Sequence, residues 1–279
     1  MIGIVINLIS SRISNVEKIN ISFLKNKKFT IIYICQLNKN LFKSLKENNL
    51  KHKNIFFELA QKNSLSSCKN QGIDFFKKKQ DIDYIWFFDD DCNIDENIAK
   101  LLSTKSLNPS IDCFIIKILS KEKKIIGRNL FFLKYLPFFA KYITGGPSMI
   151  VKKKSLKQYF DLEFGYGGHT INAEDTKFMI DNNFKRIKFL DDIFIYHPYE
   201  KTTTNRIKNY SYGQGYMFKK IPNVDFVIFS ILTLYRPILG IFFNIIKLDL
   251  KRIKFYLYRI NYFFRGVKGS VDIKNSNYQ

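Results

Sequence analysis

The sequence is short of the residues that build structural metal modules or disulfide-bonded domains. Its four cysteines, Cys35, Cys68, Cys92 and Cys113, are scattered with no C-x-x-C pair, and only three histidines are present. Zinc modules and disulfide frameworks both require closely patterned cysteines. The sequence therefore indicates neither a zinc module nor a disulfide framework.

The N-terminus lacks the features of a secretory leader. The segment MIGIVINLISSR has no basic stretch before its apolar run and no small-residue cleavage site after it. We expect this run to form the first strand of the fold, and we expect the body of the protein to stay in the cytoplasm.

Acidic residues are also scarce. There are 24 of them against 46 lysines and arginines, which leaves a net charge of +22. Such a charge attracts nucleic acid, an anionic membrane or phosphorylated small molecules, and it does not choose among them. Hydrophobic residues make up 46% of the 279 residues, which is enough for a sizeable core and argues against wholesale disorder.

Short apolar runs alternate with stretches of helical period, which is typical of a parallel or mixed sheet flanked by helices. The expected strands are residues 2–9, 29–35, 54–59, 84–88, 112–119 and 149–151. The expected helices are residues 15–24, 41–47, 65–78 and 95–102. Ligands of open α/β sheets bind beyond the carboxyl ends of the strands. Segments 10–12, 36–38 and 89–91 follow three of these strands, so we expect them to converge on one ligand site.

The segment YIWFFDDDC runs from a buried strand straight into three carboxylates. Side chains alternate along a strand, so Asp89 and Asp91 should project to one side and reach one hard cation, Mg²⁺ or Mn²⁺. Asp90 would then face elsewhere, for example toward a ribose or another sugar of the ligand. The alternative is a solvated turn or the cap of the helix that begins near Asp95.

Four further side chains are candidates for chemistry. Glu174 and Asp175, in AEDTKFM, either complement the dipole of a helix or supply a base that removes a proton from an attacking hydroxyl. His197 ends a probable strand and is either structural or a third metal ligand. His169, in GGHT, follows the glycine-rich segment FGYGG, which suits a loop whose backbone approaches a ligand.

Taken in order, these motifs resemble glycosyltransferase family 2, which has the GT-A fold. The resemblance covers about residues 2–217. Its pieces are INLISSR, NSLSSCKNQGI, FFDDDC, TGGPSMIVKK, FGYGG with AEDTKF, FLDDIFIYHP and RIKNYSYGQGYMFKK.

The resemblance implies an inverting, nucleotide-sugar-dependent transferase. Its implied metal ligands for Mn²⁺ or Mg²⁺ are Asp89, Asp91 and His197, and its implied catalytic base is Asp175, supported by Glu174. The residues expected near the donor are Ser10, Arg12, Asn38, Lys69, Asn70, Asp89 and Asp90. Those expected near the acceptor are Gly167, Gly168 and His169.

Two departures from the family pattern matter. The family's usual aspartate after the second strand is replaced by Gln36-Leu37-Asn38, which leaves the nucleotide open. The Q/R-x-x-R-W motif of processive synthases is absent after His197, which favours addition of a single sugar.

The C-terminal region is apolar and then basic. Residues 226–246 are long enough to cross a bilayer, but Arg236-Pro237 lies in their middle, so we expect a re-entrant or surface-lying pair of half-helices. The segment KLDLKRIKFYLYRINYFFRGVKG has the mixture of an interfacial helix drawn to anionic lipid. The alternative is a helical hairpin packed on the protein or on a twin subunit.

We therefore expect a transferase domain at residues 1–220, a membrane-associating extension at 221–270 and a disordered tail at 271–279. The protein should lie at the cytoplasmic face of the membrane, peripheral or monotopic. It should act on a glycan or lipid-linked acceptor in surface polysaccharide synthesis.

Two other functions compete with this interpretation. A nucleic-acid-binding protein would use the positive charge and the aromatic residues, but the cations are spread over the whole chain without a recognition motif, so we expect no nucleic-acid partner. A non-catalytic membrane scaffold would keep the fold, but the presence of Asp89, Asp91, Asp175 and His197 argues against it.

Overall fold

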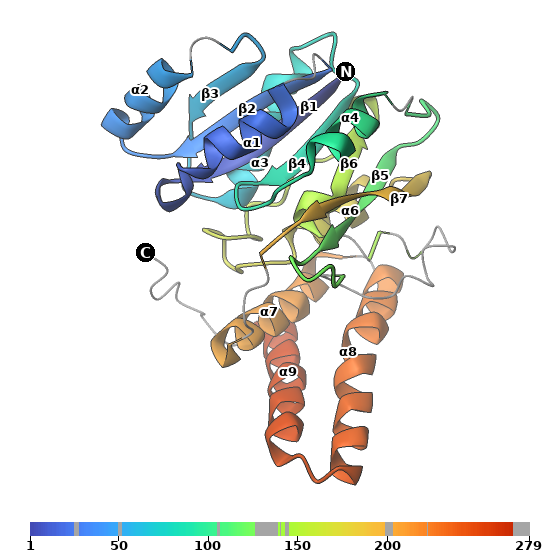
Figure 1. Cartoon of the computed structure of the whole chain (residues 1–279). Helices are drawn as coiled ribbons and strands as arrows, with labels where there is room; N and C mark the ends of the chain where they lie inside the picture. Colours follow the sequence, from blue (N-terminus) through green and yellow to red (C-terminus); the bar gives the residue numbers. More distant parts are fainter. Residues whose placement is uncertain are drawn as a thin grey trace.

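A seven-stranded mixed sheet forms the centre of the computed structural model (Figure 1). The structure describes residues 1–24, 28–49, 52–104, 107–125, 139, 141–142, 145–198, 203–221 and 223–269. The strand order is β3-β2-β1-β4-β6-β5-β7, and all neighbours pair in parallel except β6, which is antiparallel to β4 and β5. The strands are β1 (Ile2–Ile9), β2 (Phe29–Gln36), β3 (Ile55–Leu59), β4 (Tyr84–Asp89), β5 (Cys113–Leu119), β6 (Met149–Lys152) and β7 (Ile187–Tyr196).

Helices cover both faces of this sheet. They are α1 (Asn15–Leu24), α2 (Lys39–Asn48), α3 (Leu65–Lys77), α4 (Glu96–Thr104) and α6 (Glu174–Asn182). Alternate residues of β1 point to opposite faces, so Ile4 packs in a core with α1 and α4 while Val5 packs in a second core with α3 and α6. Burial on both faces explains why the parallel strands read as continuous apolar runs.

The predicted strands and helices are confirmed to within two residues at each end. Helix α2 begins at Lys39, before the predicted start, because the Asn38 side chain accepts a hydrogen bond from the backbone N–H of Leu41 and caps the helix. The register pairs Ile9 with Gln36 and Asn7 with Asp89. The carboxyl ends of β1, β2 and β4 therefore meet at one edge of the sheet, as predicted.

After β7 the chain forms α7 (Thr204–Tyr216), the short 3₁₀ helix η5 (Met217–Lys220), α8 (Asn223–Ile246) and α9 (Leu250–Lys268). Helices α8 and α9 form a hairpin that extends away from the sheet, and α7 lies between the sheet and α9 (Figure 1). Glycines allow close packing here: a Cβ on Gly215 would lie 1.9 Å from the carbonyl oxygen of Phe263, and one on Gly266 would lie 2.1 Å from that of Tyr212.

The predicted break at Arg236-Pro237 is wrong, because α8 runs through Pro237 as one helix of 24 residues. A proline removes a single backbone hydrogen bond, and packing of α9 against α8 supports the helix a turn later, where Gly240 lies against the ring of Tyr256. In the described part of the chain, α8 is the one helix long and apolar enough to cross a membrane, over Val224–Ile246. The tail predicted to be disordered, 271–279, lies outside the described residues, as does Thr144, the first residue of the segment TGGPSMIVKK.

Candidate active site

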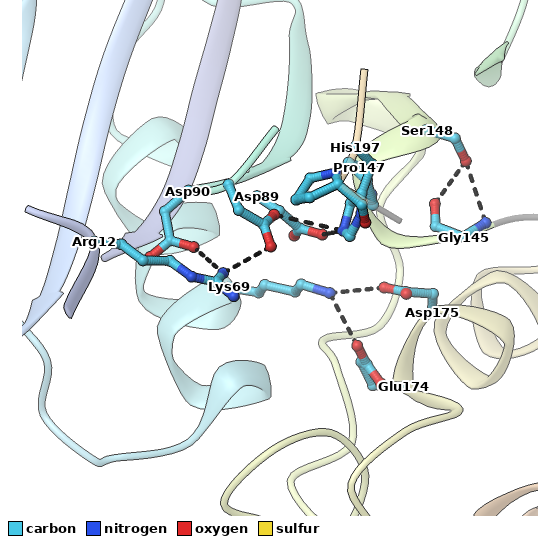
Figure 2. Close-up of polar contacts among 12 residues, drawn as sticks. Arg12, Lys69, Asp89, Asp90, Gly145, Pro147, Ser148, Glu174, Asp175 and His197 are labelled. Carbon is cyan, nitrogen blue, oxygen red and sulfur yellow. Dashed lines mark hydrogen bonds and ion pairs between the residues drawn. The ribbon is translucent and has the colours of Figure 1, made fainter. Parts of the chain in front are cut away.

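The acidic triplet lies where β4 ends, and tertiary structure brings a histidine to it. The Nε2 atom of His197 is 3.4 Å from Oδ1 of Asp91 and 3.9 Å from Oδ2 of Asp89 (Figure 2). A pair of backbone hydrogen bonds between Asn93 and Tyr196, 2.8 and 2.7 Å long, joins the segment after the triplet to the end of β7. The predicted convergence of Asp89, Asp91 and His197 is therefore found.

This group has the chemistry of a cation site. One ligand atom from each of Asp89, Asp91, Cys92 and His197 lies within 4.8 Å of the others. Oδ1 of Asp91 is buried and has no hydrogen-bond partner among the described residues. A buried carboxylate oxygen without a partner is costly unless a cation satisfies it.

The histidine is also held in a form that can ligate. Nδ1 of His197 lies 2.8 Å from the carbonyl oxygen of Pro198, and because a carbonyl only accepts, Nδ1 must donate the proton. In the neutral ring this leaves a lone pair on Nε2, directed at the two carboxylates. Hydrogen bonding from the second ring nitrogen to a carbonyl is typical of metal-ligating histidines.

Cys92 is a member of the group that sequence reasoning missed. Cys92 follows the triplet directly, which is a signal that it could lie near the cation, but a cysteine without a C-x-x-C partner does not by itself indicate a metal site. Burial raises the pKa of its thiol well above the ordinary value, and the charges of Asp89 and Asp91 raise it further. The neutral thiol is a poor ligand for a hard cation, so the favoured donors are the two carboxylates and the imidazole.

Asp90 faces away from this group, as predicted, but both its carboxylate oxygens are engaged. Oδ1 accepts a 2.6 Å hydrogen bond from Nη1 of Arg12, and Oδ2 accepts one of 3.2 Å from the backbone N–H of Ile9. Nη1 of Arg12 also lies 3.0 Å from Oδ2 of Asp91. Arg12 thus joins the end of β1 to the triplet, and a donor-binding role for Asp90 would act through Arg12.

A second carboxylate pair lies across a buried lysine from the triplet. Nζ of Lys69, on α3, is 2.7 Å from Oδ1 of Asp175 and 3.3 Å from Oε1 of Glu174 (Figure 2). Burial alone would lower the pKa of Lys69, but the charges of Asp175, Glu174 and Asp89 outweigh it and raise the pKa. Burial raises the pKa of Glu174, the charge of Asp175 raises it further, and Lys69 opposes both effects.

The backbone around this second pair has two unusual features, a left-handed residue and a glycine beside Asp175. Ala173, at the cap of α6, has φ of 75°, a left-handed conformation that is uncommon for a residue with a side chain. Gly146, in a 3₁₀ turn before β6, leaves space beside the catalytic candidate: a Cβ there would lie 3.1 Å from Oδ2 of Asp175. Sequence reasoning placed Gly146 in a motif without assigning it a role, since its neighbour Asp175 is distant in sequence.

Carboxyl groups outnumber cations in the ion pairs of the site. Among the described residues, these pairs join Arg12 and Lys69 to Asp90, Asp91, Glu174 and Asp175, and Asp89 lies beside them. Burial raises the pKa of Asp89, and the charges of Asp91 and Asp175 contribute while Lys69 opposes. Like charges held this closely favour the entry of a divalent cation.

Several predicted ligand-binding residues have structural partners. The Asn70 side chain makes two hydrogen bonds with the backbone of Phe160, 2.7 and 2.8 Å long. Asn38 caps α2, and Ser10 opens the exposed turn after β1. For these residues a donor-binding role stays a prediction.

The predicted acceptor residues lie on a loop packed against α3 and α7. Gly167 has φ of +82°, and a Cβ there would lie 2.2 Å from the carbonyl oxygen of Asn63. The ring of His169 lies 4.5 Å from that of Tyr216, and its Nε2 is 3.3 Å from the hydroxyl of Tyr212. Gly168 donates a backbone hydrogen bond to the carbonyl of Gly165. An acceptor role for this loop also stays a prediction.

The sequence matches no protein-family model and no curated protein, but solved structures share its fold. Residues 1–349 of S. aureus TarS match it at a TM-score of 0.62 and 14% identity, over 95% of this chain and 80% of that chain. The same TarS fragment in complex with UDP-GlcNAc gives 0.59 and 14%, over 95% and 81%. The mannosyltransferase PcManGT from Pyrobaculum calidifontis, in complex with GDP-Man and Mn²⁺, gives 0.65 and 10%, over 97% and 88%. The predicted glycosyltransferase-type α/β fold with a C-terminal helical extension is thus confirmed.

Proposed function

We propose that this protein is a glycosyltransferase that takes a sugar from a nucleotide-diphosphate donor with the help of a divalent cation. The observation that carries the proposal is that two clusters of carboxylates lie on opposite sides of Lys69. One cluster is Asp89 and Asp91 with His197, and the other is Asp175 with Glu174. The fold is one in which TarS binds UDP-GlcNAc and PcManGT binds GDP-Man and Mn²⁺.

Each side has a separate task in this proposal. Asp89, Asp91 and His197 would hold Mn²⁺ or Mg²⁺, and the cation would offset the negative charge that develops on the departing nucleoside diphosphate. Arg12 orients Asp91, and Lys69 supplies positive charge between the two carboxylate groups. Ser10 follows β1, Asn38 caps α2 and Asn70 lies within α3, and the proposal gives all three a role in binding the donor.

On the other side, Asp175 removes the proton from an acceptor hydroxyl, which then attacks the anomeric carbon as the diphosphate leaves. Attack from the face opposite the leaving group inverts the anomeric centre. Glu174 and Lys69 hold the Asp175 carboxylate in position. The acceptor we propose is a glycan or lipid-linked saccharide, and the order of motifs supports glycosyltransferase family 2 as the family.

The test is a screen of nucleotide sugars, UDP-GlcNAc and GDP-Man among them, for Mn²⁺-dependent hydrolysis and thermal stabilisation. Asp91→Ala should abolish the Mn²⁺-dependent stabilisation by donor, whereas Asp175→Asn should keep it and lose transfer. Asp81→Ala, at an exposed acid on the turn before β4, is the matched control and should behave as wild type. Normal turnover by both site variants would contradict the proposal.

A further inference from the structure

The hairpin of α8 and α9 exposes large apolar side chains along most of its length. The exposed fraction is 61% for Phe242, 67% for Ile246, 82% for Leu248 and 76% for Leu250. Single exposed apolar residues are ordinary on a protein surface, but a contiguous set marks an interaction site. The set here follows α8 and the turn after it, which indicates an interaction surface.

Many exposed apolar residues of α8 are spaced three, four or seven apart and so share one side of the helix. They are Val224, Val227, Ile231, Ile238, Phe242 and Ile245, and Leu239, Phe243 and Ile246 are exposed beside them in the second half of the helix. Phe229 and Thr233 are buried on the opposite side, toward the protein. The outward side of α8 is therefore a continuous apolar stripe, with solvent on it in the isolated chain.

Cations flank this stripe at the tip of the hairpin. Lys247, Lys251 and Lys254 are exposed there. Between residues 203 and 269 the acids are Asp225 and Asp249, and both are engaged: Asp225 pairs with Lys141, while Asp249 accepts a 3.0 Å hydrogen bond from the backbone N–H of Arg252 and caps α9. The surface next to the apolar stripe is thus strongly basic.

We propose that the α8–α9 hairpin docks on a lipid bilayer that carries anionic headgroups. Apolar stripes flanked by lysines are the combination that binds the interface of such a bilayer. A second copy of this chain fits less well, because a two-fold contact would bring two basic hairpins together. A full crossing is disfavoured by the exposed Arg236 at the middle of α8 and by the cations of α9.

The hairpin is linked, through α7 and η5, to the loop before the second carboxylate pair: α7 packs against α9 at Gly215 and Gly266, and α7 and η5 bind the loop. Glu163 accepts hydrogen bonds of 2.8 Å from the Tyr216 hydroxyl and 2.9 Å from Nζ of Lys220. Nδ2 of Asn172 donates a 3.0 Å hydrogen bond to the carbonyl of Tyr210. This loop leads directly to Glu174. If the proposed function holds, a docked hairpin places the acceptor side of the site beside the membrane, where a lipid-linked saccharide would be met.

The test is flotation of the full-length protein with vesicles of phosphatidylcholine, alone or with phosphatidylglycerol. Wild type should float with the anionic vesicles. Phe242→Ser/Ile246→Ser should lower the bound-to-free ratio at least about tenfold, because two large side chains no longer enter the lipid. Lys247→Gln/Lys251→Gln should lower it about 25-fold on anionic vesicles, at about fivefold per lysine.

Matched controls come from the far side of the sheet. Leu41→Ser/Leu101→Ser and Lys43→Gln/Lys46→Gln change exposed residues of α2 and α4 and should float as wild type. The inference is overturned if wild type stays unbound. It is equally overturned if the hairpin variants float normally, or if light scattering shows a lipid-free dimer that Phe242→Ser/Ile246→Ser splits while flotation is unchanged. Donor-induced thermal stabilisation of the same variants reports on the proposed function separately.

Discussion

Replacing Lys69 with methionine removes the one ammonium group that the structure places between Asp175 and Glu174. The side chains of this trio are nearly inaccessible: Lys69 is 5% exposed, Glu174 9% and Asp175 16%. Methionine keeps the length of the lysine stem but removes the charge that, among the described residues, pairs with both carboxyl groups. Removing one partner of a buried ion pair costs about 3–5 kcal/mol.

That cost corresponds to a fall in Tm of about 6–20 °C, at about 2–4 °C per kcal/mol for a chain of this size. Lys220→Met is the matched control, because Lys220 and Glu163 are 36% and 41% exposed. Exposed pairs contribute about 0.2–1 kcal/mol. The control should therefore change Tm by no more than about 4 °C, measured by differential scanning fluorimetry under the same conditions.

The effect of Lys69→Met should depend on pH. The pKa of Glu174 is raised by burial and by Asp175, and the Lys69 charge, which opposes this, is lost in the variant. A carboxyl group whose folded pKa is raised binds its proton more tightly in the folded state, so stability falls as pH rises through that pKa. The difference in Tm between variant and wild type should be larger at pH 8 than at pH 5, and Glu174→Gln should recover part of it.

An equal loss of Tm at both pH values, with no recovery from Glu174→Gln, would refute the ion-pair reasoning. A loss no larger than that of Lys220→Met would refute the estimate from burial.

Three more outcomes are expected. Mn²⁺ at about 100 times its Kd should stabilise wild type by about 2.7 kcal/mol in urea unfolding, and the effect should vanish with EDTA or in Asp91→Ala; stabilisation of that variant by Mn²⁺ would refute the assigned ligands. Gly215→Ala should lower the free energy of unfolding by about 1–3 kcal/mol, because the added Cβ would lie 1.9 Å from the carbonyl oxygen of Phe263. Gly145→Ala should lower it less in the same urea titration, because the added Cβ would lie 3.6 Å from the side chain of Ile118. Hydrogen bonds from Lys220 and Tyr216 lower the pKa of Glu163 from its ordinary value of 4.5. Glu163→Gln should therefore be less stable than wild type at pH 7, and the difference in stability should disappear as pH falls below about 4.5. A difference that persists at pH 3 would contradict this.

The local structure followed from the sequence because its causes are local. The alternation of apolar runs and helical periods determined the strands up to β6 and the helices α1 to α4. The cap at Asn38, which starts α2 two residues before its predicted start, was not predicted although its cause is also local. The placement of Asp89 and Asp91 at the end of a buried strand was also readable, since a run of apolar residues that ends in three acids has to leave the core at that point.

Tertiary structure decided which of these residues meet. His197 lies more than a hundred residues from the triplet, and its approach depends on the pairing of β7 with β5 and on the Asn93–Tyr196 bridge. The contact of Lys69 with Asp175 depends on α3 and α6 covering one face of the sheet. The continuity of α8 through Pro237 depends on its packing with α9. A sequence records which side chains can bind a cation or a proton, but distances between elements are set by the packing of the whole core, and no single segment contains that information.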